Sequence, residues 1–199
     1  WKVMALIWAA LPIINGLVFC KVPIASLIEE GETGMTLGEL CRNKIFWILM
    51  LMMLCAGASE QAVSQWASTF AEKGLGVTKT IGDLAGPMAF AILMGSARAF
   101  YGKFGDKINL DQFMIGSSAL CILSYLTISL SASPLIALIG CSICGLSVGI
   151  MWPGTISISS KAFPTGGTAM FALLAMAGDL GGSIGPATVS YTHLTLPTT

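Results

Sequence analysis

The 199-residue chain contains little charge: Lys, Arg, Asp and Glu together make up 10% of it, against about 25% in an ordinary soluble domain. It also lacks a surplus of positive charge, because ten Lys and Arg residues balance ten Asp and Glu residues. The first shortage excludes a soluble globular protein. The second excludes nucleic-acid binding, which depends on neutralising many phosphates. What the chain contains instead is apolar surface: 55% of its residues are hydrophobic and its mean hydropathy is +0.82.

The apolar residues are gathered into long stretches. Six of them can be marked, at residues 3–20, 45–71, 81–101, 113–131, 135–157 and 168–188. Their lengths lie near the roughly 20 residues that an α-helix needs to cross a hydrocarbon core of about 30 Å. We therefore expect an all-α polytopic membrane protein with six transmembrane helices embedded in a lipid bilayer.

The connections between the stretches indicate how the chain is oriented. If successive helices alternate in direction, the connections 21–44, 102–112 and 158–167 lie on one side of the membrane. They carry six Lys and Arg residues, whereas the opposite side carries three. The side richer in these residues is expected to be cytoplasmic, so Trp1 starts outside. The 21–44 connection is long and mostly polar, and we interpret it as a cytoplasmic linker between two helical bundles.

The connections do not contain the residues that an enzyme needs. They hold no nucleophile beside a base and no cluster of metal ligands. Cys141 and Cys144 form a C-x-x-C pair without a second pair, and we interpret them as small packing residues rather than metal ligands. The sequence therefore predicts neither an enzyme nor a cofactor.

The last residues, 189–199, read VSYTHLTLPTT, a Thr-rich run without charge. This string resembles the in-frame translation of a transposase adapter that is used to prepare sequencing libraries. We interpret it as a sequencing artefact, which would leave His193, the single histidine of the chain, without a role. The remaining 188 residues are then expected to be an open reading frame that is broken at both ends.

Glycines recur at intervals of four inside the apolar stretches. Gly145 and Gly149 form one such pair, and Gly178 and Gly182 form another. Residues four apart share a helix face, and small residues there allow two backbones to approach closely. These four glycines are therefore predicted to be helix-packing positions.

Four charged side chains, Glu60, Asp83, Arg98 and Asp179, fall inside the apolar stretches. A charge at mid-bilayer costs at least about 2.5 to 3.5 kcal/mol, so an intramembrane carboxylate is by default a candidate functional residue. Asp83 is expected in the first turn of its helix, where it would satisfy free N–H groups. Glu60 and Asp179 are expected well inside the membrane.

Glu60 belongs to a polar segment, SEQAVSQWAS, whose side chains cover a broad helix face. Such a face suits a water-filled cavity that hydrogen-bonds a hydroxylated solute. The predicted cavity residues are Glu60, Gln61, Ser64, Gln65 and Trp66. The alternative is that these polar groups are buried between helices as packing contacts.

Asp179 lies among glycines in the segment AGDLGGSIGP. A carboxylate in an apolar setting can exchange protons near neutral pH, so Asp179, like Glu60, is a candidate for coupling transport to a cation. The alternative for Asp179 is burial against a polar group of a neighbouring helix.

The segment RAFYGKFGDKIN joins the third and fourth stretches. Arg98, Gly102 and Asp106 are spaced four and four, which places them near one line along a helix. Together with Lys107 they are predicted to form a gate at the cytoplasmic membrane edge, where a charge network could hold two helices together. The segment resembles the G-x-x-x-D-[KR]-x-G-[RK] loop signature of the major facilitator superfamily. Gly102, Asp106 and Lys107 match it, while the last glycine and the last basic residue of the signature are replaced.

In that family the second copy of the signature lies between helices eight and nine. The resemblance therefore implies that the chain covers helices six to eleven of a longer protein. Residues 1–20 would be the last helix of the N-terminal half, 21–44 the linker, and 45–188 five of the six helices of the C-terminal half. The rest of the N-terminal half would be missing from this chain. The family also implies a multi-pass protein of a bacterial-type inner (plasma) membrane.

Three further segments, GASEQAVSQW, MWPGTISISSKAFPTGG and AGDLGGSIGP, are similar to the sugar-permease branch related to fucose permeases. The resemblance implies a secondary active transporter that works by alternating access, in which two halves rock about a site near the bilayer midplane. It would be a symporter that moves a small polar solute such as a sugar with a cation, expected to be a proton. Two alternatives stay open: a superfamily exporter of drugs or organic ions, and a non-transporting membrane subunit.

Overall fold

The computed structural model describes residues 2–22, 34–131 and 133–195. The chain forms two compact units, Trp1–Thr33 and Gly34–Thr199. The described part of the first unit contains the helix α1 (Lys2–Phe19), and none of the residues of α1 is buried within the chain. Most of the predicted linker, residues 23–33, and the last residues of the adapter-like tail, 196–199, lie outside the described residues.

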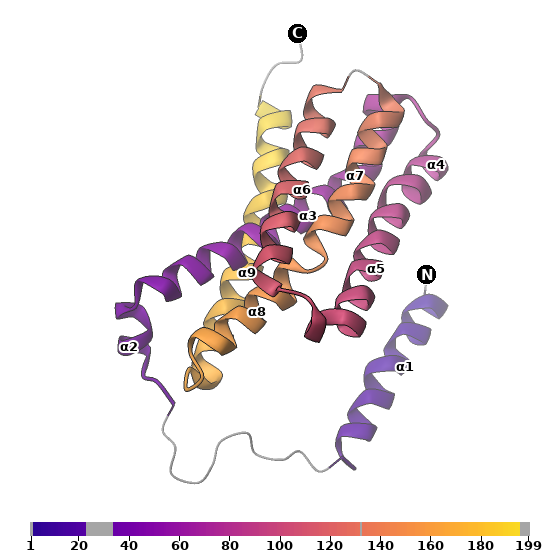
Figure 1. Ribbon diagram of the computed structural model, residues 1–199. Coiled ribbons are helices and arrows are strands. Elements are labelled where there is room, and N and C mark those ends of the chain that lie inside the picture. Colours follow the sequence, from indigo (N-terminus) through magenta and orange to yellow (C-terminus); the bar gives the residue numbers. More distant parts are fainter. Residues whose placement is uncertain (1, 23–33, 132, 196–199) are drawn as a thin grey trace. The chain divides into compact units, whose positions relative to one another are not determined.

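All the regular secondary structure of the second unit is helical over the residues that are described (Figure 1). Its elements are α2 (Leu37–Arg42), α3 (Lys44–Leu75), α4 (Lys79–Asp83), the π-helix η1 (Leu84–Met88), α5 (Ala89–Phe104), the 3-10 helix η2 (Gly105–Lys107), α6 (Leu110–Leu130), α7 (Pro134–Val148), α8 (Met151–Ala162) and α9 (Gly167–Thr195). Side-chain caps fix the starts of α2, where Thr36 and Glu39 form a capping box, and of α3 and α6. Asn43 accepts a hydrogen bond from the amide of Ile45 at the start of α3, and Asn109 accepts one from the amide of Gln112 at the start of α6.

Six segments among the described residues are long and apolar enough to cross a membrane. They are Lys2–Phe19, Lys44–Lys73, Lys79–Phe104, Leu110–Leu130, Leu135–Ala162 and Gly167–Tyr191. The prediction of an all-α protein with six membrane-spanning segments is therefore confirmed.

The third span differs from the expectation at its start. The helix begins at Lys79, so Asp83 is the last residue of α4 rather than part of a first turn, and the prediction that it caps the helix is wrong. Its carboxylate instead accepts a hydrogen bond from the hydroxyl of Ser68 on α3. The π-helix η1 follows at once and contains Pro87, whose missing N–H interrupts the regular helical hydrogen bonds.

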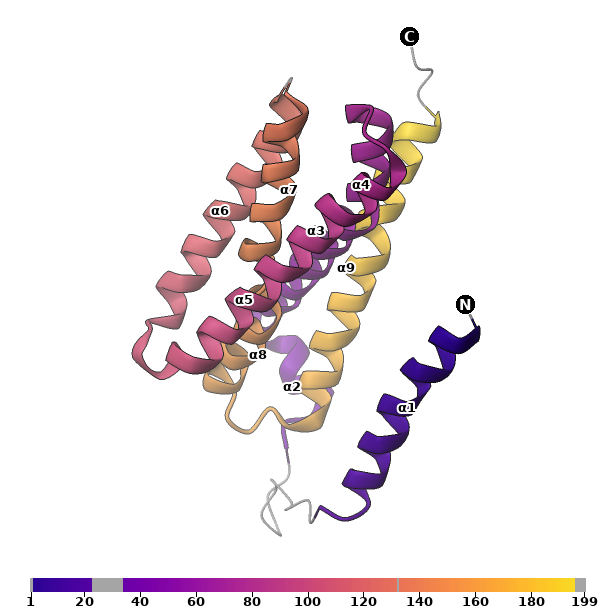
Figure 2. The ribbon, with the colours of Figure 1, turned by 90° about the vertical axis from the view of Figure 1, so that its right-hand side faces the viewer.

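The fifth span is also more complex than its sequence suggests. The apolar stretch 135–157 is divided between two helices, α7 and α8, which are separated at Gly149 and Ile150. Figure 2 shows α8 beyond the end of α7 in the same part of the bundle. Near this break α7 packs closely against α5 at Gly145. A methyl group added at Gly145 would lie 2.3 Å from the carbonyl oxygen of Phe90, so only glycine fits there.

The closest helix contact of the unit joins α3 and α9. A methyl group added at Gly181 would lie 1.9 Å from the carbonyl oxygen of Leu54, and one at Gly57 would lie 2.0 Å from the carbonyl oxygen of Gly178. Any residue larger than glycine would therefore force the two backbones apart.

The predicted packing glycines lie at such contacts to different degrees. An added methyl group would lie 2.3 Å from the indole of Trp152 at Gly178, and 2.8 Å from the carbonyl oxygen of Met94 at Gly149. At Gly182 the nearest atom is Cγ of Gln61, at 3.1 Å, so that contact is looser.

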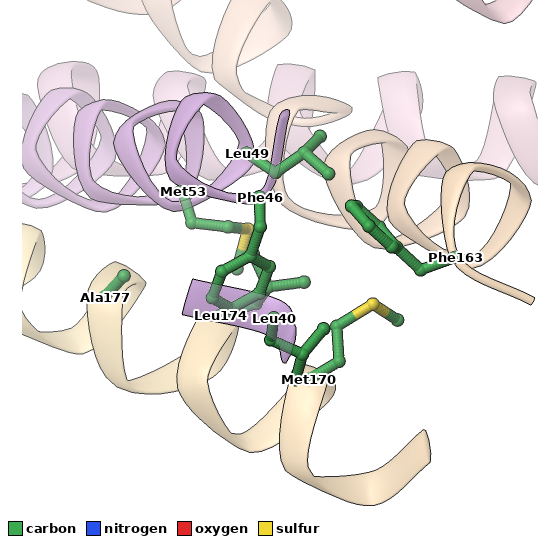
Figure 3. Packing of buried hydrophobic residues seen from close by; sticks show 8 residues of the cluster. All are labelled: Leu40, Phe46, Leu49, Met53, Phe163, Met170, Leu174 and Ala177. Atoms are coloured by element: carbon green, nitrogen blue, oxygen red, sulfur yellow. The ribbon is translucent and has the colours of Figure 1, made fainter. Parts of the chain in front are cut away.

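Around this contact lies an apolar core that includes the short helix α2 (Figure 3). The buried residues of this cluster are Leu40, Phe46, Leu49, Met53, Phe163, Met170, Leu174 and Ala177. Leu40 is the member from α2 and is completely buried. The amide of Met35 also donates a 2.9 Å hydrogen bond to the carbonyl oxygen of Thr165 in the α8–α9 connection. Together these contacts fix the segment before α3 to one end of the bundle.

The outside of the unit is apolar as well. On α6 the buried residues recur at helical spacing; they are Leu110, Met114, Ser117, Cys121 and Ser124. The exposed face of the same helix carries Ile115, Ile122, Leu123, Leu126 and Leu130. An inner face that includes serine and an outer face of large aliphatic side chains is what a lipid environment favours.

Candidate functional site

The described part of the chain contains a cavity of about 840 Å³ between α3, α5, α8 and α9. It is lined by Gly57, Glu60, Gln61, Arg98, Trp152, Pro153, Ile156, Ser157, Gly178, Asp179, Gly182 and Ser183. This set brings together three of the four charged residues that fall inside the apolar stretches. All four helices belong to membrane-spanning segments, so the cavity brings charged side chains together within an apolar bundle.

Glu60 and Arg98 form an ion pair across the cavity wall. Nη2 of Arg98 lies 3.4 Å from Oε2 of Glu60, which joins α5 to α3. The side chain of Glu60 is 17% exposed and that of Arg98 is 44% exposed. Pairing removes much of the cost of placing either charge inside the membrane.

Arg98 is held by a second contact, to the break between α7 and α8. Its Nε donates a 3.0 Å hydrogen bond to the carbonyl oxygen of Gly149. In a continuous helix this carbonyl would accept a hydrogen bond from the N–H four residues later. That residue is Pro153, which has no N–H. The proline therefore frees the acceptor that positions the guanidinium.

The predicted cavity residues of α3 are divided between two hollows. Glu60 and Gln61 line the larger cavity, whereas Gln65 and Trp66 line a second one of about 410 Å³. Ser64 is among the lining residues of neither, and its hydroxyl donates to the carbonyl oxygen of Gln61 at 3.4 Å. The two cavities adjoin, because Gly182 and Ser183 line both.

Hydrogen bonds fix this polar face of α3. The side-chain Nε2 of Gln65 donates a hydrogen bond to the side-chain Oε1 of Gln61 at 3.2 Å. The indole N–H of Trp66 donates to the carbonyl oxygen of Pro186 on α9 at 3.2 Å. The alternative of polar groups buried between helices therefore describes Trp66 and Ser64 better than it describes Glu60 or Gln61.

Asp179 is exposed and lines the larger cavity. The expectation that it could be buried against a neighbouring helix is not met. Among the described residues its carboxylate takes part in no ion pair. The hydroxyl of Ser183, one turn later, donates to the backbone carbonyl of Asp179 at 3.0 Å.

The residues of the predicted gate are described only in part, so the gate stays a prediction. Arg98 contacts Glu60 on the wall of the cavity, six residues before α5 ends at Phe104, and its placement at the membrane edge stays a prediction. Gly102 is exposed on α5 with no neighbour within 4 Å of an added methyl group. Lys107 is exposed at the end of η2. The side chain of Asp106 lies outside the described residues.

Sequence reasoning missed the contribution of α8 to the cavity, which comprises Trp152, Pro153, Ile156 and Ser157. The signal was present, because the segment MWPGTISISS is rich in hydroxyl groups for a membrane span and contains a proline. A hydroxyl facing a cavity cannot be told from one that bonds its own backbone by sequence alone. Thr155 and Ser159 of the same helix are fully buried and donate to carbonyls four residues earlier.

A bundle of membrane-length helices around a cavity with charged side chains is the architecture of an integral multi-pass membrane transporter. Comparison with known families matches residues 1–186 to the Major Facilitator Superfamily, so the chain belongs to this family of membrane transporters, which are not enzymes. No curated protein and no solved structure matches the chain.

Proposed function

We propose that the chain is part of a secondary active transporter that moves a small polar solute, such as a sugar, by alternating access in symport with a proton. The observation that carries this proposal is the Glu60–Arg98 ion pair on the wall of a cavity between membrane-spanning helices. A cavity of about 840 Å³ is within the usual range for a small-molecule site, about 300 to 1,000 Å³.

The lining supports a hydroxylated solute. Gln61 offers an amide, and Ser157 and Ser183 offer hydroxyl groups. Trp152 adds an aromatic surface on which a sugar ring could pack. Gln65 and Trp66 would extend this surface into the adjoining cavity.

Glu60 is the proposed coupling residue. A proton on its carboxylate would remove the charge that attracts Nη2 of Arg98, while the Nε contact to Gly149 would remain. Protonation would therefore loosen α3 from α5 without releasing Arg98 from the α7–α8 break. Asp179 is a second candidate for this role, since it is a carboxylate in the same cavity.

The remaining assignments follow the family's arrangement of two halves. We propose that α1 ends the N-terminal half, that 21–44 is the cytoplasmic linker, and that 45–188 supplies five helices of the C-terminal half in a bacterial-type plasma membrane. Gly102, Asp106 and Lys107 are proposed to act at the cytoplasmic edge. Residues 189–199 are proposed to be adapter-derived, and the family match at 1–186 is in keeping with this.

The test is Glu60→Gln in the intact transporter that contains this sequence, reconstituted in proteoliposomes. We expect this change to abolish uptake driven by an imposed proton gradient, because glutamine cannot release a proton. Glu72→Gln is the matched control, since Glu72 is exposed near the end of α3 and does not line the cavity. Gradient-driven uptake that survives Glu60→Gln would remove Glu60 from the coupling mechanism. Lower accumulation of lipophilic cations in cells would instead identify an exporter.

A further inference from the structure

We infer that the cavity binds the protonated amine of its solute at Asp179, so that the transported solute is a small hydroxylated amine rather than a neutral sugar. This inference rests on the proposed function and specifies the chemical class of the solute.

The charges of the cavity do not balance. Glu60, Arg98 and Asp179 are its charged lining residues, and Glu60 and Arg98 neutralise each other at 3.4 Å. Asp179 has no ion-pair partner within the described part of the chain. A carboxylate without a countercharge is costly inside a membrane, so the net charge of the cavity lining favours a solute with one positive charge.

An aromatic ring on the wall of the same cavity favours an organic cation. Gly178 precedes Asp179, and a methyl group there would lie 2.3 Å from Cζ2 of Trp152. Because glycine has no side chain, the indole lies directly against the helix at the position before the carboxylate. Tryptophan is the most favourable aromatic partner for an ammonium group, and both side chains line the same cavity.

The hydroxyl of Ser183 provides an acceptor next to the carboxylate. Its hydrogen is donated to the backbone carbonyl of Asp179 at 3.0 Å, so its oxygen lone pairs remain free to accept a hydrogen bond. An ammonium group has three donors and no acceptor. A carboxylate, a hydroxyl oxygen and an indole are therefore complementary to it.

A metal cation fits this lining less well. Ca²⁺ takes six to eight oxygen ligands, typically from several carboxylates. The described residues contain no group of three or more His, Cys, Asp or Glu side chains that could hold a metal ion. A single carboxylate with an aromatic neighbour suits a cation that needs few direct ligands.

The experiment compares solutes that differ in charge but little in shape. The intact transporter in detergent is titrated with glucosamine and glucose, and with choline and its neutral analogue 3,3-dimethylbutan-1-ol, while thermal unfolding is followed. The measurement is made near pH 6, where a primary amine is protonated, because the pKa of an α-amino group is roughly 7.7 to 8.0. We expect each cation to stabilise the protein at a concentration about tenfold lower than its neutral partner.

The variants assign this preference to Asp179. Asp179→Asn keeps the shape and should make the two members of each pair equally effective, whereas Asp179→Glu should retain the preference and shows that the protein still folds with a carboxylate on this turn. Glu72→Gln, which removes a charge outside the cavity, should also retain it. Equal effects in the unmodified protein, no stabilisation by any of the four probes, or a preference that survives Asp179→Asn would each overturn the inference. The proposed function is tested separately by the proton-gradient dependence of uptake, so a transporter that is driven by protons but prefers neutral solutes would contradict the inference alone.

Discussion

Arg98 donates a hydrogen bond from Nε to the carbonyl oxygen of Gly149 at 3.0 Å. The carbonyl is available because Pro153, four residues later, has no N–H to offer it. The same guanidinium contacts Glu60 through Nη2. One side chain on α5 therefore joins α3 to the break in the fifth span.

Pro153→Ala should weaken this arrangement. Alanine restores the N–H that competes for the Gly149 carbonyl, and a hydrogen bond to a charged group contributes about 1.5 to 3 kcal/mol. We expect the initial rate of gradient-driven uptake to fall by about tenfold or more, measured per amount of folded transporter in proteoliposomes. Pro12→Ala is the control, because Pro12 lies in α1, outside the unit that forms the cavity. An unchanged rate in Pro153→Ala would mean that Arg98 does not need this anchor.

The ion pair itself makes a prediction about stability. Arg98→Met leaves the carboxylate of Glu60, only 17% exposed, without its partner, and the expected loss is about 1 to 3 kcal/mol. This is below the loss for a fully buried pair because Arg98 is 44% exposed. The double variant Glu60→Gln with Arg98→Met should recover part of the loss, since no unpaired charge remains. Thermal unfolding in detergent of the unmodified protein, the two single variants and the double variant gives the coupling energy between the two side chains. Additive losses of stability would contradict the pairing.

The six spans could be predicted from sequence because span length and hydropathy are local properties. The pairing of Arg98 could not. Its spacing from Gly102 and Asp106 places it on a line along one helix, but the spacing does not say which neighbouring helix faces that line. The partner, Glu60, is 38 residues away on another helix. The two charges meet only because α5 packs against α7 while α4 and η1, which precede α5 in the same span, pack against α3.

The glycines show the same division. Intervals of four relate Gly178 to Gly182 and Gly181 to Gly185, yet the tightest positions in the α3–α9 contact also include Gly57. Gly57 has no glycine three or four residues away, so no interval marks it. Its contact with α9 depends on where the two helices cross, which is a property of the assembled bundle.

Gly181→Ala is expected to destabilise the bundle strongly. The new methyl group would lie 1.9 Å from the carbonyl oxygen of Leu54, so α3 and α9 must separate, and overpacking of this kind costs about 1 to 3 kcal/mol or more. Gly95→Ala is the matched control, because Gly95 lies inside α5 with nothing within 4 Å of an added methyl group. There alanine should stabilise the helix by about 0.5 to 1 kcal/mol. Thermal unfolding in detergent should therefore move in opposite directions for the two variants, and equal shifts would contradict the close α3–α9 contact.

The stability of helix α2 is expected to depend on pH through the carboxyl group of Glu39. Glu39 accepts hydrogen bonds from the amide of Thr36 at 2.8 Å and from its hydroxyl at 2.9 Å, and these lower the pKa of Glu39 from its ordinary value of 4.5. A carboxyl group whose pKa is lowered by folding contributes fully to the stability of the folded state when the pH is above the pKa of that group in the unfolded chain. That contribution to stability is lost as the pH falls through the lower pKa that the carboxyl has in the folded protein.

We therefore expect α2 to loosen on acidification below about pH 4.5, the ordinary value for this carboxyl. Hydrogen exchange of the Leu40 amide, which donates to the carbonyl oxygen of Thr36 at 3.1 Å, measures this after correction for the intrinsic effect of pH. Glu39→Gln is the matched variant, because glutamine can also form the capping box but does not titrate in this range. Protection of Leu40 should fall with pH in the unmodified protein and stay level in Glu39→Gln. A parallel fall in both proteins would mean that another group controls the attachment of α2, and protection that stays level in both would mean that the charge of Glu39 contributes nothing to the cap.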